Sequence, residues 1–196
     1  QVAGLGNWGI TEGLVYENWR KYDFSVAEIT KLSGIKSAFG LDFGYTNDET
    51  ALFCGLVDVV GKTIYVFDEL YEKSLSNEDI YNKIVSMGYA KERIRADCAE
   101  PKSIDRLRTL GLRHIRACRK GKDSINNGID FIQNYEILIH PKCKGFLKEI
   151  SNYMWEKDKH TGKPTNVPCD EFNHLMDAMR YAMEGIGKNS GITILK

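Results

Sequence analysis

Three aspartates lie where a carboxylate could bind a divalent cation. Asp42 follows the apolar run Phe39-Gly40-Leu41, Asp97 ends the strand-like stretch 93–97, and Asp177 lies among the methionines of the last amphipathic segment. A carboxylate among apolar neighbours is costly unless it is paired or bound to a cation. Clustered acids can hold the Mg²⁺ or Mn²⁺ ions that serve phosphodiester hydrolysis. Taken singly, each aspartate is equally explained by a side chain that faces water.

Two further side chains could join such a site. His174 precedes Asp177 by three residues, so both would lie on one face of a helix. The imidazole could orient a water, bind a metal or contact a scissile phosphate, and a purely structural role is the alternative. Glu69, near the end of the strand-like run 63–70, could add an oxygen ligand or could be an ordinary surface carboxylate.

Nucleic-acid contacts would have to be local, because Lys plus Arg and Asp plus Glu number 27 each and leave no net charge. Lys102 and Arg106 follow Asp97 at helical spacing and are candidates for contacts with a DNA backbone. A polar stretch, 153–168, supplies Lys157, Lys159 and Lys163 just before the segment of Asp177. A solvated surface is the competing interpretation for all five cations.

Length and composition fit one globular domain with a hydrophobic core, at 196 residues and 42% hydrophobic content. The five cysteines are odd in number and widely spaced, without a CxxC pair, which argues against a zinc site and against a disulfide framework. No run of about 18 apolar residues occurs, so we expect no membrane association.

The chain divides into an antiparallel half and an alternating half. Residues 37–43, 51–60 and 63–70 are strand-like, and Gly61-Lys62 is short enough for a tight hairpin. Helical and strand-like segments then alternate, and parallel strands need such crossover helices. The predicted helices begin at 77, 101, 124, 141 and near 170, and the predicted strands are 93–97, 114–117 and 136–140. The pattern predicts an α/β fold, a mixed sheet of three antiparallel strands followed by alternating helices and strands, flanked by helices.

Three strings occur in the order of known nuclease motifs: Gly40-Leu41-Asp42-Phe43-Gly44, Ala96-Asp97-Cys98-Ala99-Glu100-Pro101 and Asn173-His174-Leu175-Met176-Asp177-Ala178-Met179-Arg180-Tyr181. They resemble the nuclease domain of the large terminase subunits of tailed bacteriophages, a branch of the ribonuclease H-like superfamily. The resemblance implies a metal-dependent endonuclease that cuts concatemeric viral DNA during genome packaging. It further implies two divalent ions, Mg²⁺ or Mn²⁺, with Asp42 bridging both and with Asp97 and Asp177 each favouring one.

The same resemblance implies a wider setting. No phosphate loop of the GxxxxGK[ST] type occurs, so an ATPase motor would lie elsewhere in the full-length chain. We expect residues 1–36 to be a segment from that motor domain, 37–186 the nuclease domain and 187–196 a C-terminal tail. Double-stranded DNA, a portal protein and a small terminase subunit would be partners in the host cytoplasm, outside the mature virion. A different ribonuclease H-like nuclease or resolvase, or a non-catalytic module that binds DNA or portal, remains an alternative.

Overall fold

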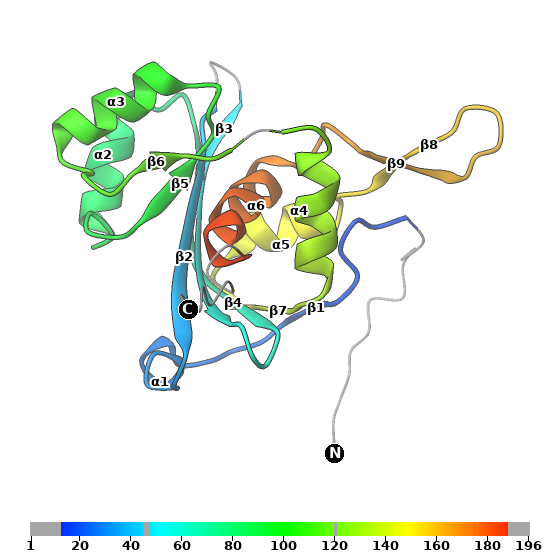
Figure 1. Ribbon diagram of the computed structural model, residues 1–196, viewed down its shortest axis with the longest axis horizontal. Coiled ribbons are helices and arrows are strands. Elements are labelled where there is room, and N and C mark those ends of the chain that lie inside the picture. Colours follow the sequence, from blue (N-terminus) through cyan, green and yellow to red (C-terminus); the bar gives the residue numbers. More distant parts are fainter. Residues whose placement is uncertain (1–12, 45–47, 120, 188–196) are drawn as a thin grey trace, which may run out of the picture.

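A seven-stranded mixed sheet forms the centre of the molecule. The computed structural model describes residues 13–44, 48–119 and 121–187. The strand order is β1-β7-β4-β3-β2-β5-β6, and a separate two-stranded hairpin, β8-β9, extends from the body (Figure 1). Among the described residues, no helix is long and apolar enough to cross a membrane.

The first half of the sheet is the predicted antiparallel unit. Strands β2 (Ile35–Asp42), β3 (Glu49–Asp58) and β4 (Thr63–Lys73) pair in sequence. The β3–β4 turn is closed by Asp58, whose carboxylate accepts the backbone N–H groups of Val60 and Gly61 at 3.0 and 2.8 Å. A carboxylate in this place replaces the backbone acceptor that the turn would otherwise lack.

Crossover helices connect the parallel strands of the second half. In chain order the elements are α2 (Asn77–Ser86), β5 (Ile94–Ala96), α3 (Pro101–Leu110), β6 (Arg116–Ala117), α4 (Ser124–Gln133), β7 (Glu136–Ile139), α5 (Lys144–Ile150) and α6 (His174–Gly187). Strand β5 is parallel to β2, and β7 is parallel to β4. Helix α2 starts with a capping box between Ser76 and Asp79, and α3 starts at Pro101, as the sequence predicts.

Each face of the sheet buries a core of its own. Apolar residues of one face, including Leu41 and Leu52, pack with Ile84 of α2 and Leu107 of α3. The other face packs against α4, α5 and α6 (Figure 1). Alternate residues of the central strands supply both cores, because successive strand side chains point to opposite faces. The predicted α/β fold, a mixed sheet covered by helices, is confirmed.

The N-terminal boundary differs from the prediction. Strand β1 (Trp19–Lys21) pairs in parallel with β7, a short helix α1 (Val26–Ile29) follows, and Val15 and Tyr16 are buried in the core. The described part of the segment 1–36 therefore packs as part of the same folded unit, and its origin in a preceding domain stays a prediction. Residues 1–12 and 188–196, which include nearly all of the predicted tail, lie outside the described residues.

The approach to the last helix also differs. The helix expected near Asp170 begins at His174, because Phe172 has a φ of 58°, which a right-handed helix cannot contain. The polar stretch before it forms a hairpin, with β8 (Trp155–Lys157) antiparallel to β9 (Pro164–Pro168). Its turn is held by Asp158, whose carboxylate accepts the N–H groups of His160 and Thr161.

Candidate active site

Two of the predicted aspartates lie at the same edge of the sheet. Leu41 of β2 is in register with Ala96 of β5, and the N–H of Asp97 donates to the carbonyl of Leu41 at 3.0 Å. Because the two strands are parallel, the residues that follow this pair, Asp42 and Asp97, are neighbours across the strand ends. The carboxyl end of a sheet is a common place for a functional site in α/β folds.

Helix α6 brings the third aspartate to this edge through an unusually close packing contact. A Cβ atom added at Gly40 would lie 1.8 Å from the carbonyl oxygen of Ala178, so only glycine lets α6 lie directly on β2. Asp42 is two residues from Gly40 and shares its face of the strand. Asp177 precedes Ala178 in the helix. The glycine contact therefore determines how the two acids approach each other.

The three carboxylates interact electrostatically. The Asp42 side chain is 13% exposed. Burial, and to a smaller extent the charges of Asp177 and Asp97, raise its pKa from 3.8 to about 6, although the hydrogen bond from His174 acts to lower it. The same three aspartates raise the pKa of Tyr181, which lies beside them on α6. Asp97 and Asp177 thus lie close enough for their charges to act on Asp42, and the binding of a metal by the three acids stays a prediction.

His174 is held between two acids. Its Nδ1 lies 3.1 Å from Oδ2 of Asp42, and its Nε2 lies 3.8 Å from Oε2 of Glu49. The hydrogen bond with Asp42 raises the pKa of His174, against the effect of burial. Glu49 is the first residue of strand β3. Its contact with His174 could not be predicted from the sequence, because the two residues are 125 positions apart and meet only after folding.

A cation accompanies Asp177. Nη2 of Arg180 lies 2.9 Å from Oδ1 of Asp177, one helical turn away, and the arginine side chain is 10% exposed. Such a nearly buried pair offsets part of the negative charge at the site. The three-residue spacing of Asp177 and Arg180 could have predicted this ion pair from the sequence.

A buried carboxylate supports the first turn of α6. Glu149 of α5 is fully buried, and its Oε2 accepts the N–H of Leu175 at 2.6 Å. Burial raises its pKa, whereas the charge of His174 lowers it. The first N–H groups of a helix have no partner within the helix, so Glu149 fixes the turn that carries His174 and leads to Asp177.

Glu69 makes a different contact from the one expected of an additional metal ligand. Its two oxygens accept the N–H groups of Gly145 and Phe146, both at 2.7 Å, at the start of α5. The carboxylate thus caps a helix, and both of its oxygens have backbone partners. This geometry gives Glu69 a structural role.

The predicted DNA-binding residues lie in two places. Lys102 is exposed on α3, and Nε of Arg106 lies 2.7 Å from Oε1 of Glu78 on α2, so its charge is already paired. Lys157, Lys159 and Lys163 are exposed on the β8–β9 hairpin. Their contact with DNA stays a prediction.

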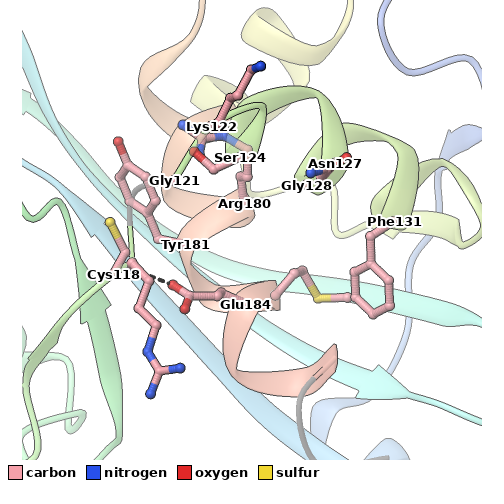
Figure 2. Close-up of a pocket in the computed structure, with 12 residues that line it drawn as sticks. Cys118, Gly121, Lys122, Ser124, Asn127, Gly128, Phe131, Arg180, Tyr181 and Glu184 are labelled. Atoms are coloured by element: carbon pink, nitrogen blue, oxygen red, sulfur yellow. Dashed lines mark hydrogen bonds between the residues drawn. The ribbon is translucent and has the colours of Figure 1, made fainter.

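Hollows adjoin the acids on the α6 side of the sheet. A cavity of about 460 Å³ lies between α4 and α6, and Figure 2 shows Arg180 and Tyr181 of α6 together with Lys122 and Ser124 around it. A second hollow, of about 550 Å³, is lined by Asp177, Arg180, Tyr181 and residues 166–168 of the hairpin. The base of the hairpin is therefore beside the acidic site.

A third hollow forms a basic cleft along the β5–β6 edge. It has a volume of about 700 Å³, and six of its lining residues are basic: Lys36, Arg93, Arg95, His114, Arg116 and Arg119. Arg119 and Glu184 line both this cleft and the 460 Å³ cavity, so the two hollows adjoin. Three of these residues, His114, Arg116 and Arg119, lie in one basic stretch of the sequence, 106–122.

Comparison with known proteins identifies the arrangement. Residues 42–185 match a family model described as the terminase RNAseH-like domain. The large terminase subunit of Bacillus phage SPP1 is 31% identical over 196 residues, which cover 98% of this chain and 44% of that protein. The chain belongs to the large terminase family. It is a nuclease domain of that family and spans less than half of the SPP1 subunit.

Two further relatives agree with this terminase assignment. The PBSX phage terminase large subunit of Bacillus subtilis is 28% identical over 149 residues, covering 74% of this chain and 33% of that protein. The crystal structure of the SPP1 large terminase nuclease domain with bound Mn superposes with a TM-score of 0.80. It is 31% identical, and the match covers 88% of this chain and 99% of that one.

Proposed function

We propose that this terminase domain is a metal-dependent endonuclease that cuts concatemeric viral DNA during genome packaging. One observation carries the proposal: Asp42, Asp97 and Asp177 come from two strand ends and a helix, and their charges act together on Asp42. Clustered, partly buried carboxylates are costly to the fold, and a bound cation would neutralise their charge and stabilise them. The manganese in the related SPP1 domain supports the same interpretation.

The residues present fit two divalent ions. The donors are carboxylates, which Mg²⁺ and Mn²⁺ prefer, and burial together with mutual repulsion leaves Asp42 with a pKa of about 6. Asp42, on which the charges of both other acids act, would be a ligand common to the two ions. When bound, such ions supply the positive charge that favours ionised water and an anionic transition state.

The chain's own side chains hold and orient this arrangement. Asp42 would be the shared ligand, with Asp97 and Asp177 as ligands on either side. His174, fixed through Nδ1 by Asp42, carries a proton more readily than a free histidine and can donate it in a hydrogen bond to a DNA phosphate. Arg180 keeps Asp177 in place from within the helix.

The basic cleft supports DNA as the substrate. The chain has no net charge, yet six basic side chains gather in one hollow that adjoins the cavity beside Tyr181. Phosphate contacts supply most of the affinity for DNA, and they come chiefly from arginine and lysine. We assign the duplex to this cleft, with the hairpin lysines as contacts on the other side of the acids.

The partners of the domain are proposed from its similarity to the SPP1 large terminase subunit. Because the chain spans 44% of the SPP1 subunit, we propose that an ATPase motor domain shares its full-length polypeptide. A portal protein and a small terminase subunit would be its partners, in the cytoplasm of the host. The competing proposals are a resolvase-like nuclease with another DNA substrate and a module that retains the acids without cutting.

The decisive experiment incubates the domain with supercoiled plasmid in Mg²⁺, Mn²⁺ or excess chelator. Cleavage with either ion, abolished by chelator and by Asp42→Asn, is the expected result. Asp105→Asn is the matched control, because Asp105 is an exposed aspartate on α3 whose partner is Arg108. Undiminished nicking in chelator would rule out the metal mechanism. Binding of Mn²⁺ without any cleavage would instead favour the non-catalytic module, and preference for branched DNA would favour a resolvase.

A further inference from the structure

Two cysteines lie beside Asp97. Cys98 follows it directly, and Cys118 follows strand β6, which pairs in parallel with β5. The N–H of Cys118 donates to the carbonyl of Ala96 at 2.7 Å, so Cys118 lies level with Asp97 across the two strand ends. One carboxylate oxygen of Asp97 and the two sulfur atoms all lie within 4.8 Å of one another.

These three atoms have the chemistry of a site for a thiophilic ion. Tetrahedral Zn²⁺ binds sulfur at about 2.3 Å and carboxylate oxygen at about 2.0 to 2.2 Å, so ligands of one ion are about 3.5 to 4 Å apart. Small rotations of the side chains close the remaining gap. Two thiolates select Zn²⁺ or Cd²⁺ over Mg²⁺ and Mn²⁺, which prefer oxygen ligands.

Access to the site is available from the protein surface. Cys98 is partly exposed, and Cys118, although only 6% exposed, lines the 460 Å³ cavity between α4 and α6. An ion can therefore reach both sulfur atoms without unfolding the sheet. The sequence pattern had argued against a zinc site, because the two cysteines are 20 residues apart and form no CxxC pair.

We propose that Asp97, Cys98 and Cys118 form a second cation site that takes Zn²⁺ or Cd²⁺ and, by doing so, withdraws Asp97 from the catalytic acids. Each thiol releases its proton to solvent as the ion binds, and the fourth position stays open to water. An ion here and an ion held by Asp97 in the catalytic set exclude each other. The competition for Asp97 rests on the proposed nuclease function, whereas the binding of Zn²⁺ or Cd²⁺ does not.

Binding is measured first, with Cd²⁺ as the probe and without DNA. Titration of the reduced domain should give the ultraviolet thiolate-to-cadmium charge-transfer band, saturating at one ion per chain. Cys98→Ser, Cys118→Ala and Asp97→Asn should each weaken Cd²⁺ binding by about tenfold or more, since even indirect partners of metal ligands are worth that much. Cys169→Ser is the matched control, because Cys169 is another partly exposed cysteine and lies outside the cluster.

The second measurement is inhibition, with each variant compared with its own zinc-free rate. Micromolar Zn²⁺ should slow Mn²⁺-supported cleavage by the wild type and by Cys169→Ser, and should have at least about tenfold less potency against Cys98→Ser. Circular dichroism verifies the fold of each variant. If Cys118→Ala unfolds, Cys98→Ser, at the more exposed position, is sufficient to test the proposal.

Two results would overturn the proposal. They are a charge-transfer band that persists at full affinity in Cys98→Ser, and loss of the band in Cys169→Ser. A domain that binds Cd²⁺ as expected but cuts no DNA would contradict the nuclease function and leave this site intact.

Discussion

At the scale of single residues, the acidic site is a place where the fold bears a cost. Asp42 is largely buried next to two other carboxylates, and its hydrogen bond from His174 offsets only part of the penalty. Moving the pKa from 3.8 to about 6 corresponds to at most about 3 kcal/mol that the metal-free fold loses when Asp42 ionises. Stability given up in this way at a ligand-binding site is recovered when the ligand binds.

Asp42→Asn should therefore stabilise the metal-free domain in a pH-dependent way. A carboxylate whose folded pKa is raised costs nothing below 3.8, where it is protonated in both states, and its full penalty applies above about 6. Thermal melts in chelator should show equal midpoints near the lower value and a higher midpoint for the variant above pH 6. The gain should stay below about 3 kcal/mol, because His174 loses its acceptor.

Addition of Mn²⁺ should reverse that order, since the ion stabilises the wild type more than the variant. The exposed Asp105→Asn serves as the control and should melt like the wild type throughout. An Asp42→Asn domain that is less stable than the wild type at neutral pH in chelator would contradict the assignment of Asp42 as a strained, buried acid.

Glu149 provides a second prediction at this scale. Glu149→Ala removes the acceptor of the Leu175 N–H and leaves space in the core, which should cost about 2 to 4 kcal/mol in the free energy of unfolding. Glu149→Gln keeps an acceptor and should cost less. Urea denaturation measures both, with the exposed Glu156→Ala as control. Equal stability of the Ala and Gln variants would mean that the hydrogen bond to Leu175 does not hold the helix.

The sequence revealed the ligand candidates but not the residues around them. Asp42, Asp97 and Asp177 stand in apolar surroundings within recognisable motifs, so their types and positions were informative before folding. The contacts of Glu49 and Glu149 with the start of α6 join distant parts of the chain, and nothing local distinguishes these two residues from ordinary surface acids. The backbone partners of Glu69 at the start of α5 lie more than 70 residues away, so these contacts could not be predicted from the local sequence either.

At the scale of the elements, the packing of α6 on β2 sets the site. Gly40 has no side chain to separate the strand from the helix, and the alanines at 178 and 182 keep the helix surface flat where it meets the strand. Alanine at such a contact acts as overpacking, which forces the backbone to move.

Gly40→Ala should consequently destabilise the domain by about 1 to 3 kcal/mol and should reduce cleavage by more than the loss of folded protein explains. Displacing α6 moves Asp177 away from Asp42, so activity should fall even at temperatures where the variant is fully folded. Gly121→Ala is the control, because a Cβ there meets nothing within 4 Å. Wild-type activity in a folded Gly40→Ala domain would show that the contact does not position the acids.

Element positions were predictable where their causes are local. Caps, turns and alternation placed β2 to β4, α2 and α3 to within a few residues. Strand β1 was not predicted, because its three mostly polar residues form a strand only by pairing with β7, more than 110 residues later. The late start of α6 depends on the left-handed conformation of Phe172, a residue type that rarely adopts it.

At the scale of the whole molecule, a neutral chain separates its charges. Acids gather at the carboxyl end of β2 and β5, and basic residues line the cleft that runs along the β5–β6 edge. A global count of charges conceals this separation. Local fields of this kind attract a polyanion to one side of a protein.

The double variant Arg95→Gln/Arg116→Gln should lower the affinity for duplex DNA regardless of sequence and should reduce the slope of log K against log salt by about 2. Fluorescence anisotropy at several salt concentrations measures both. Lys21→Gln/Lys31→Gln is the matched control, because neither lysine lines the cleft and Lys21 lies on β1, at the opposite edge of the sheet. An unchanged salt slope would place the duplex elsewhere.

The N-terminal segment gives the domain a mechanical property. Leu14 bridges Met154, Val15 donates to the carbonyl of Tyr153 at 2.9 Å, and Trp155 donates to the carbonyl of Gly13 at 2.8 Å. These backbone bonds fasten the chain at residues 13–15 to the root of the hairpin, whose far strand borders the hollow next to Asp177. A pull on Gly13 would therefore be transmitted through these bonds to the root of the hairpin, beside the hollow that Asp177 lines.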